Sequence, residues 1–196
     1  MREENYQLIK ALRRELHQHP ELSHQEKWTK ARLIEFLKEH TSLEIVEHDV
    51  WFYAIHREEG ATENLAFRAD IDALPIHESL DIPHCSTIPG VSHKCGHDGH
   101  AAAMCGLALE IEGVKTGKNI FLLFQHAEET GGGAIEAVGF IHENNIEEIF
   151  AYHNVPGFPL GQIIYKYGTS HYASRGMIIE MIGHPSHAST PEFGIE

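Results

Sequence analysis

The sequence has few cysteines and no long apolar run. Its 196 residues include three cysteines, Cys85, Cys95 and Cys105, which form no C-x-x-C pair. An odd count, together with a polar N-terminus (Met1–Asn5) that lacks the apolar core of a secretory signal, argues against a disulfide framework. No apolar segment is long enough to span a bilayer. We therefore expect reduced thiols and a cytoplasmic location.

Basic residues are also scarce. Lysine and arginine number 15 against 29 acidic residues, which gives a formal net charge of -14. Without a basic tract, binding to nucleic acid or to an anionic membrane is not expected. The sequence has no internal repeat and no low-complexity linker. Its length can bury a substantial core in one or two domains.

Apolar periodicity predicts two helices near the N-terminus. The first carries an apolar stripe from Tyr6 to Leu16 and ends near His19-Pro20. Ser23-His24-Gln25-Glu26 has the form of a capping box, with serine at the cap and glutamate three residues later. A second helix is therefore expected to follow Ser23.

Short apolar segments that alternate with helical patterns predict an α/β fold. The expected strands are Leu43–Val46, Trp51–Ile55, Leu65–Phe67, Asn119–Gln125, Ile149–Tyr152 and Gly161–Tyr165. Of these, Asn119–Gln125 and Ile149–Tyr152 have the apolar content of buried strands. Further helices are expected over Ala101–Ile111 and Gly133–Ile141. We predict a mixed sheet flanked by helices on both faces.

The C-terminal segment changes character. A new apolar strand is expected over Gly176–Ile182, followed by Gly183–Ser189 and a helix start at Thr190–Glu192. We interpret this segment as the beginning of a second, α+β domain. The predicted domains are residues 1–172 and 173–196.

One segment is unusually rich in metal-binding residue types. His93–His100 contains three histidines, Cys95 and Asp98, and the glycines at 96 and 99 allow the backbone to bend closely around a bound group. Cys95 alone could be a small buried apolar residue. The whole segment indicates a metal site.

Polar side chains follow three of the predicted strands. Asp70 and Asp72 come after the first, Glu128 and Glu129 after the second, and His153 after the third. Taken singly, the glutamates could be a solvated surface and His153 a structural histidine. Because ligands bind beyond the carboxyl ends of strands in open α/β sheets, we expect these groups to converge.

The donor set selects the metal and the chemistry. Thiolate, imidazole and carboxylate together favour zinc, with manganese, cobalt and nickel as alternatives. Of two adjacent glutamates, one can bind metal while the other acts as a general base toward a water that the metal activates. These groups predict hydrolysis of an amide.

Five motifs resemble one enzyme family. They are His19-Pro20-Glu21-Leu22-Ser23 with Glu26, Arg68–Ile76, Cys95–His100, Phe124–Glu129, and His153 with Pro156. Their order and spacing are similar to the amidohydrolase branch of the aminoacylase and glutamate-carboxypeptidase family of two-metal metallopeptidases, which includes hippurate hydrolase, indoleacetyl-amino-acid hydrolase and N-acetyl-diaminopimelate deacetylase. The resemblance implies a zinc-exopeptidase-like catalytic domain followed by the start of an inserted α+β lid and dimerisation domain.

The resemblance also implies roles for individual residues. Metal ligands would be Cys95, His97, Glu129 and His153, with Cys95 as the bridge between two divalent ions. Catalytic roles would fall to Glu128 as general base, Asp72 as a carboxylate that orients a ligand, and His187 as the lid histidine that contacts substrate. The substrate would be an N-acyl amino acid or a small peptide, and the complete protein would form a homodimer through the lid.

The sequence departs from the family at several points. Relatives commonly have proline where His126 stands; that histidine could be another group near the metals or an incidental change, and we favour the second interpretation. Sister branches use a ligand histidine at the position of Asp70, whose role stays open. The resemblance covers about the first half of a family member, and a late histidine ligand would lie beyond Glu196. We expect a site without that ligand to bind its second metal weakly.

Two alternative functions remain open at this level. Cys95 could be the nucleophile of a cysteine hydrolase, with a nearby histidine as base. Alternatively, the chain could be a non-catalytic module that binds metal or a partner.

Overall fold

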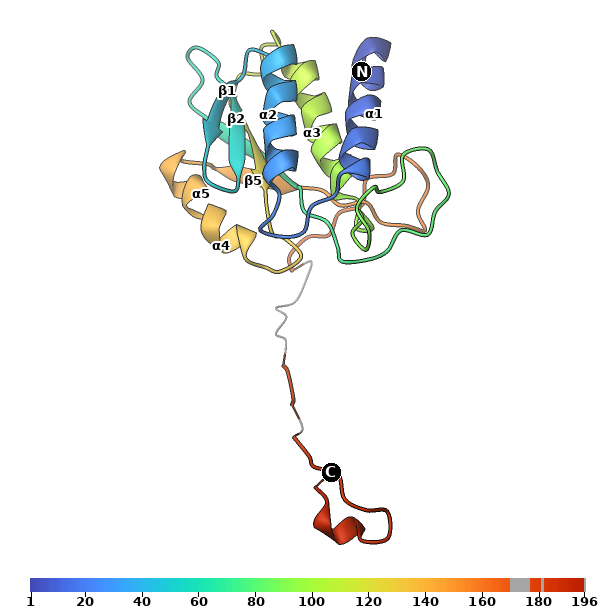
Figure 1. Cartoon of the computed structure of the whole chain (residues 1–196). Helices are drawn as coiled ribbons and strands as arrows, with labels where there is room; N and C mark the ends of the chain where they lie inside the picture. The colour runs from blue at the N-terminus through green and yellow to red at the C-terminus, as the bar shows by residue number, and fades with distance from the viewer. Residues whose placement is uncertain (170–176, 181, 196) are drawn as a thin grey trace. The chain divides into compact units, whose positions relative to one another are not determined.

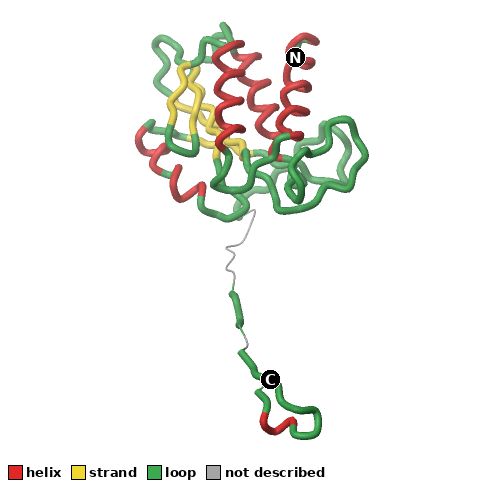
Figure 2. Tube along the Cα trace, viewed as in Figure 1, coloured by secondary structure: helices red, strands yellow, loops and turns green. Residues whose placement is uncertain are grey.

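The computed structural model describes residues 1–169, 177–180 and 182–195. The chain forms two compact units, Met1–Val155 and Pro156–Glu196. Figures 1 and 2 show the first unit as a sheet with helices packed against it. The strands are β1 (Glu44–Glu47), β2 (Phe52–His56), β3 (Asn64–Asp70), β4 (Asn119–Gln125) and β5 (Glu148–Ala151). The helices are α1 (Glu3–Gln18), α2 (Lys27–His40), α3 (His97–Ile111), α4 (Gly133–Ala137) and α5 (Gly139–Glu143), with a 3-10 turn η1 (Pro191–Phe193) in the second unit.

The sheet is mixed, as predicted, with the strand order β1-β2-β4-β3-β5. β2 pairs with β1 and β4 in antiparallel fashion, whereas β3 is parallel to both β4 and β5. The carboxyl ends of β3, β4 and β5 therefore meet at one edge. This edge is where the predicted site residues begin.

Side chains alternate between the two faces of the sheet along each strand, and this divides the core into two layers. Phe52 of β2 and Phe124 of β4 point to one face, where their rings stack 4.5 Å apart, centroid to centroid, beneath α1, α2 and α3. Tyr53 and Phe121 point to the other face, where they pack with Phe140 of α5. Because successive strand residues face opposite sides, the continuous apolar run of β4 serves both layers.

The prediction of a capping box at Ser23 was wrong. α2 begins at Lys27, and the Ser23 hydroxyl donates to Asp72 instead of a helix amide. The carboxylate of Glu21 caps the helix, because its two oxygens accept hydrogen bonds from the amides of Trp28 and Thr29 at 3.1 and 2.8 Å. A negative charge at this end also favours the helix dipole.

Four other predictions need correction. Residues 161–165 form no strand, and the predicted helix over Gly133–Ile141 is two short helices separated by a turn at Val138. β5 begins and ends one residue before the predicted Ile149–Tyr152 and is exposed, since it lies at the sheet edge and, among the described residues, pairs only with β3. The predicted domain boundary at 172/173 lies outside the described residues, as do Gly176 and Met181 of the predicted strand 176–182. Residues 177–180 of that segment are not in a strand.

Among the described residues, none of the helices has the length and apolar character needed to cross a membrane.

Candidate metal centre

The centre is built around the ring of His97, the first residue of α3. His97 Nδ1 lies 3.0 Å from the backbone oxygen of Asp72 and 3.1 Å from its carboxylate Oδ1. Since both partners are acceptors, Nδ1 must carry the hydrogen and the Nε2 lone pair is free to bind a cation. Neither side chain is exposed. Holding one ring nitrogen so that the other can ligate is the usual arrangement of a metal-binding histidine.

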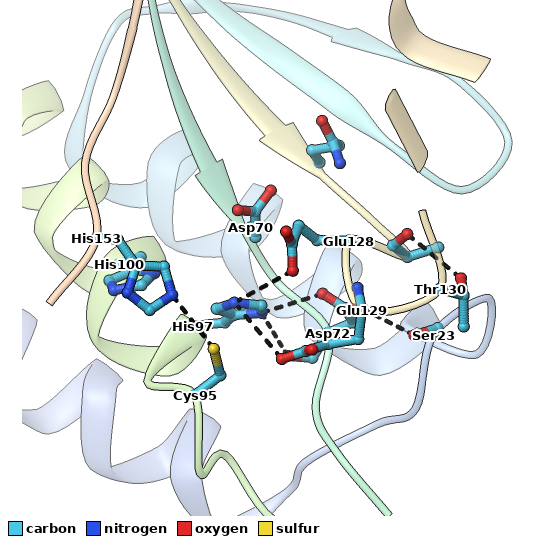
Figure 3. A network of polar contacts seen from close by, with 12 residues as sticks. Ser23, Asp70, Asp72, Cys95, His97, His100, Glu128, Glu129, Thr130 and His153 are labelled. Atoms are coloured by element: carbon cyan, nitrogen blue, oxygen red, sulfur yellow. Dashed lines mark hydrogen bonds and ion pairs between the residues drawn. The ribbon is translucent and has the colours of Figure 1, made fainter. Parts of the chain in front are cut away.

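The free nitrogen of His97 faces the two glutamates that follow β4. Glu128 Oε2 and Glu129 Oε1 both lie 3.9 Å from His97 Nε2 (Figure 3). No described group gives this buried nitrogen a hydrogen bond. An unpartnered buried imidazole beside two carboxylates fits a cation, because a metal ion would satisfy all three groups.

Cys95 and His153 complete the cluster from two further segments. Cys95 Sγ lies 3.2 Å from His153 Nε2 (Figure 3). Ligand atoms of Cys95, His97 and His153 all lie within 4.8 Å of one another, and the same holds for Asp70, His97 and Glu128. With Glu129 beside His97, the four predicted ligands lie at one edge of the sheet, and Asp70 lies there too, as the sequence led us to expect.

Asp72 ties the centre to the surrounding chain. Its Oδ2 accepts hydrogen bonds from the Ser23 hydroxyl at 2.8 Å and from the Glu129 amide at 3.0 Å. Burial raises the pKa of Asp72, but the hydrogen bonds from His97, Glu129 and Ser23 outweigh it, and the net shift is downward. Asp72 therefore stays ionised and orients both a histidine and a glutamate.

The carboxylates give the centre a negative electrostatic potential. Burial, followed by the interaction of the thiol with the Glu129 carboxylate and by the charge of Glu128, raises the pKa of Cys95 to about 12. Burial lowers the pKa of His97, yet its hydrogen bond with Asp72 and the neighbouring negative charges raise it overall. Burial also raises the pKa of Asp70, in spite of the ion pair with Arg68. Each of these shifts reflects negative charge or burial that a bound cation would compensate.

Residues behind the ligands hold His153 in place. Asn154 Oδ1 lies 2.6 Å from Nε2 of the buried His100, whose ring stands edge-on to that of His153. The Tyr152 hydroxyl donates to the backbone oxygen of His100. Gly96, with φ of +99°, is required here, because a Cβ at this position would lie 2.7 Å from Asn154 Oδ1. The sequence analysis did not single out Asn154, for which adjacency to His153 was the available signal, and it gave Ser23 a different role, as a helix cap.

The loop that carries Glu128 is strained at one point. Ala127 adopts φ of +47°, which is unusual for a residue with a side chain. Its amide donates to the buried Glu26 Oε1 at 2.7 Å, and its oxygen accepts from the Gly133 amide. These bonds hold a conformation that turns Glu128 and Glu129 back toward His97.

His187 belongs to the second unit. Its Nδ1 lies 2.7 Å from the Ser189 hydroxyl and accepts a hydrogen bond from the Ser189 amide. The ring is exposed. Its predicted role as a lid histidine stays a prediction.

The mixed sheet, with thiol, imidazole and carboxylate groups gathered at the carboxyl ends of its parallel strands, has the architecture of a metallopeptidase catalytic domain. Residues 66–193 match the model of peptidase family M20/M25/M40. The chain belongs to this family, which confirms the family predicted from the motifs.

Named relatives agree with this assignment. The chain is 37% identical to an N-acetyl-L-cysteine deacetylase of Bacillus subtilis, over 97% of this chain and 46% of that protein. It is 33% identical to an N-acetyldiaminopimelate deacetylase of Exiguobacterium sibiricum, over 94% of this chain and 51% of that protein. The chain thus spans about half the length of the curated relatives it matches.

A solved structure shows the same fold. The Bacillus subtilis YXEP protein, a dinuclear metal binding peptidase from the M20 family, superposes with a TM-score of 0.77 at 33% identity. The match covers 82% of this chain and 46% of that one. The predicted fold class of a mixed sheet flanked by helices is therefore confirmed.

Proposed function

We propose that this chain forms part of a metal-dependent amidohydrolase that removes the acyl group from N-acyl amino acids. The observation that carries the proposal is the ring of His97. Asp72 holds one of its nitrogens, and the other faces Glu128 and Glu129 with no partner of its own. The named relatives, which are deacetylases of N-acetylated amino acids, supply the substrate class.

The residues that would hold the metals are Cys95, His97, Glu129 and His153. Their sulfur, nitrogen and oxygen donors suit zinc best, with manganese, cobalt and nickel as alternatives. The dinuclear metal centre of the similar structure supports two ions. When bound, such ions polarise a carbonyl and lower the pKa of a water molecule.

Glu128 is proposed as the general base. Its side chain is 39% exposed, whereas that of Glu129 is 22% exposed, so Glu128 is the more accessible of the pair to water and substrate. Glu128 Oε2 would take the proton of the attacking water and deliver it to the amine that leaves. Asp72 would act by holding His97 and the Glu129 amide in place.

Further features concern the whole protein. The three cysteines are free, which agrees with a cytoplasmic location. His187 is proposed to reach substrate from a lid that would also join two copies as a homodimer.

The contact between Cys95 and His153 also suits a second function. A thiol 3.2 Å from an imidazole is the arrangement of a cysteine hydrolase. A cysteine hydrolase would give the carboxylates around His97 no role, and burial together with those carboxylates raises the pKa of the Cys95 thiol, which disfavours the nucleophilic thiolate. Alkylation of metal-free protein, followed by assay after metal is restored, distinguishes a nucleophile from a ligand.

The proposed function is tested by hydrolysis of N-acetylated amino acids. The protein should release acetate from N-acetylcysteine or N-acetyldiaminopimelate, lose this activity with a chelator and regain it with zinc or manganese. Metal uptake by this chain without hydrolysis of any such substrate would favour the non-catalytic module. Activity that survives complete metal removal would contradict the proposal.

A further inference from the structure

A second group of metal-binding side chains lies outside the centre at His97. Ligand atoms of His24, His126 and Glu136 all lie within 4.8 Å of one another. His126 Nε2 is 3.1 Å from Glu136 Oε2, and the rings of His24 and His126 stand edge-to-face with 5.6 Å between centroids. The three residues come from the loop before α2, the end of β4 and α4, respectively.

His126 is the buried member of this group. Its side chain is 0% exposed, and Nδ1 has no hydrogen-bond partner among the described residues. A neutral ring that donates from Nε2 to Glu136 leaves the Nδ1 lone pair unsatisfied. In the other tautomer Nδ1 carries the hydrogen and the Nε2 lone pair faces the Glu136 carboxylate. The 3.1 Å between Nε2 and Oε2 is close to the roughly 3.4 Å that separates two ligand atoms of a tetrahedral zinc ion. This second tautomer offers a buried lone pair that a cation held together with Glu136 would satisfy.

The backbone conformation at His24 places its ring beside that of His126. His24 adopts φ of +65°, and its Nε2 lies 3.3 Å from the Thr130 hydroxyl. Gly132 leaves room for the ring, since a Cβ there would lie 2.9 Å from His24 Cε1. His24 and Glu136 are exposed, so an ion from solvent can reach them.

We propose that His24, His126 and Glu136 form a separate site for a divalent cation of the zinc class. Two imidazoles and one carboxylate are a ligand set that binds zinc and leaves a fourth position for water. The interpretation of His126 as an incidental change is replaced by this role.

An ion at this site would join three segments around the loop that carries Glu128. Residues 126–133 lead from β4 into α4, and His24 belongs to the segment whose Ser23 supports Asp72. The ion would thereby fix the ends of the loop and stabilise the fold. This inference does not depend on the proposed hydrolysis.

The test uses the 196-residue chain with the centre at His97 disabled by Cys95→Ser and His97→Ala. We expect this variant to bind one equivalent of Zn²⁺ in equilibrium dialysis. Adding His24→Ala or Glu136→Gln should each weaken binding at least tenfold. Both positions are exposed, so these substitutions should leave the circular dichroism spectrum unchanged. His142→Ala and Glu143→Gln, at exposed positions of α5, serve as matched controls and should bind zinc normally.

Two further readouts identify the site. Zinc at a hundred times its Kd should raise the Tm of the disabled variant by about 5 to 10 °C, and His24→Ala should remove this increase. Cobalt bound there should lack the near-ultraviolet thiolate band expected of a site that contains Cys95. Zinc binding that is absent from the disabled variant, or that persists in either His24→Ala or Glu136→Gln, would overturn the proposal.

Discussion

The carboxylate of Asp72 fixes the orientation of the buried ring of His97: 3.1 Å separates Oδ1 from Nδ1, and neither side chain is exposed. The other oxygen of Asp72 accepts from Ser23 and from the Glu129 amide. One carboxylate therefore connects the loop before α2, the end of β3, the start of α3 and the loop after β4. These contacts position His97 and Glu129 at the centre.

Replacing Asp72 by asparagine should weaken zinc binding at His97 by about 10- to 100-fold, since an amide cannot hold the ring as a carboxylate does. The measurement is a competitive zinc titration of the 196-residue chain. Asp81→Asn, at an exposed position, is the matched control. Equal affinity in the Asp72 and Asp81 variants would show that Asp72 does not orient a ligand.

Replacing Glu128 by glutamine should retain metal and lower kcat by about 10²- to 10⁴-fold, because the amide cannot accept the proton of the attacking water. Elemental analysis and turnover of an N-acetyl amino acid by the protein check the two parts. Glu143→Gln controls for loss of an exposed carboxylate. Turnover at the wild-type rate would rule out Glu128 as the base.

Replacing Cys95 by serine should reduce bound zinc and abolish the thiolate-to-cobalt band of the cobalt-loaded protein. Cys85→Ser is the control, because Cys85 is a free cysteine outside the cluster. Unchanged metal content together with an unchanged cobalt spectrum would remove Cys95 from the ligand set.

A buried ion network predicts how stability depends on pH. Burial raises the pKa of Glu78, but hydrogen bonds from Lys94, the Ser86 amide and His17 outweigh it and lower the pKa to about 2. The hydrogen bond with Asp98 raises the pKa of His17 despite burial. The Glu78 contribution is present above pH 4.5 and is lost as the pH falls toward 2. The His17 contribution is present below pH 6.5 and is lost as the pH rises through its raised pKa.

Glu78→Gln should therefore lower the free energy of unfolding by about 2 kcal/mol near pH 5.5 and flatten its decline in acid. Urea unfolding of the chain between pH 2 and pH 8 measures this effect. Glu59→Gln removes an exposed carboxylate and should reproduce the wild-type curve. A Glu78 variant with the same acid dependence as the wild type would contradict this assignment.

Strand positions and the candidate ligands were predictable because their signals are local. The run Asn119–Gln125 forms β4 with the predicted bounds, and helix α3 contains all of the predicted Ala101–Ile111. Since parallel strands end at the same edge, the positions of Asp72, Glu129 and His153 after their strands were enough to predict that they converge. The five motifs were enough to identify the family.

Features that depend on partners distant in sequence were not predictable in this way. Ser23 reads locally as a helix cap, but Asp72, 49 residues later, offers its hydroxyl a buried carboxylate. The apolar residues of β5 predict a buried strand, yet its exposure depends on what lies beside it in the sheet. Helical periodicity over Gly133–Ile141 does not show the turn at Val138.

The sequence by itself determined the fold class, the family and the kinds of donor atom at the metal centre, because patterning and residue chemistry are properties of short segments. Only the tertiary structure decided which nitrogen of His97 is held and which is free, and that His24, His126 and Glu136 meet. Both depend on distances between side chains from separate segments, and these distances are set by how the helices and loops pack around the sheet.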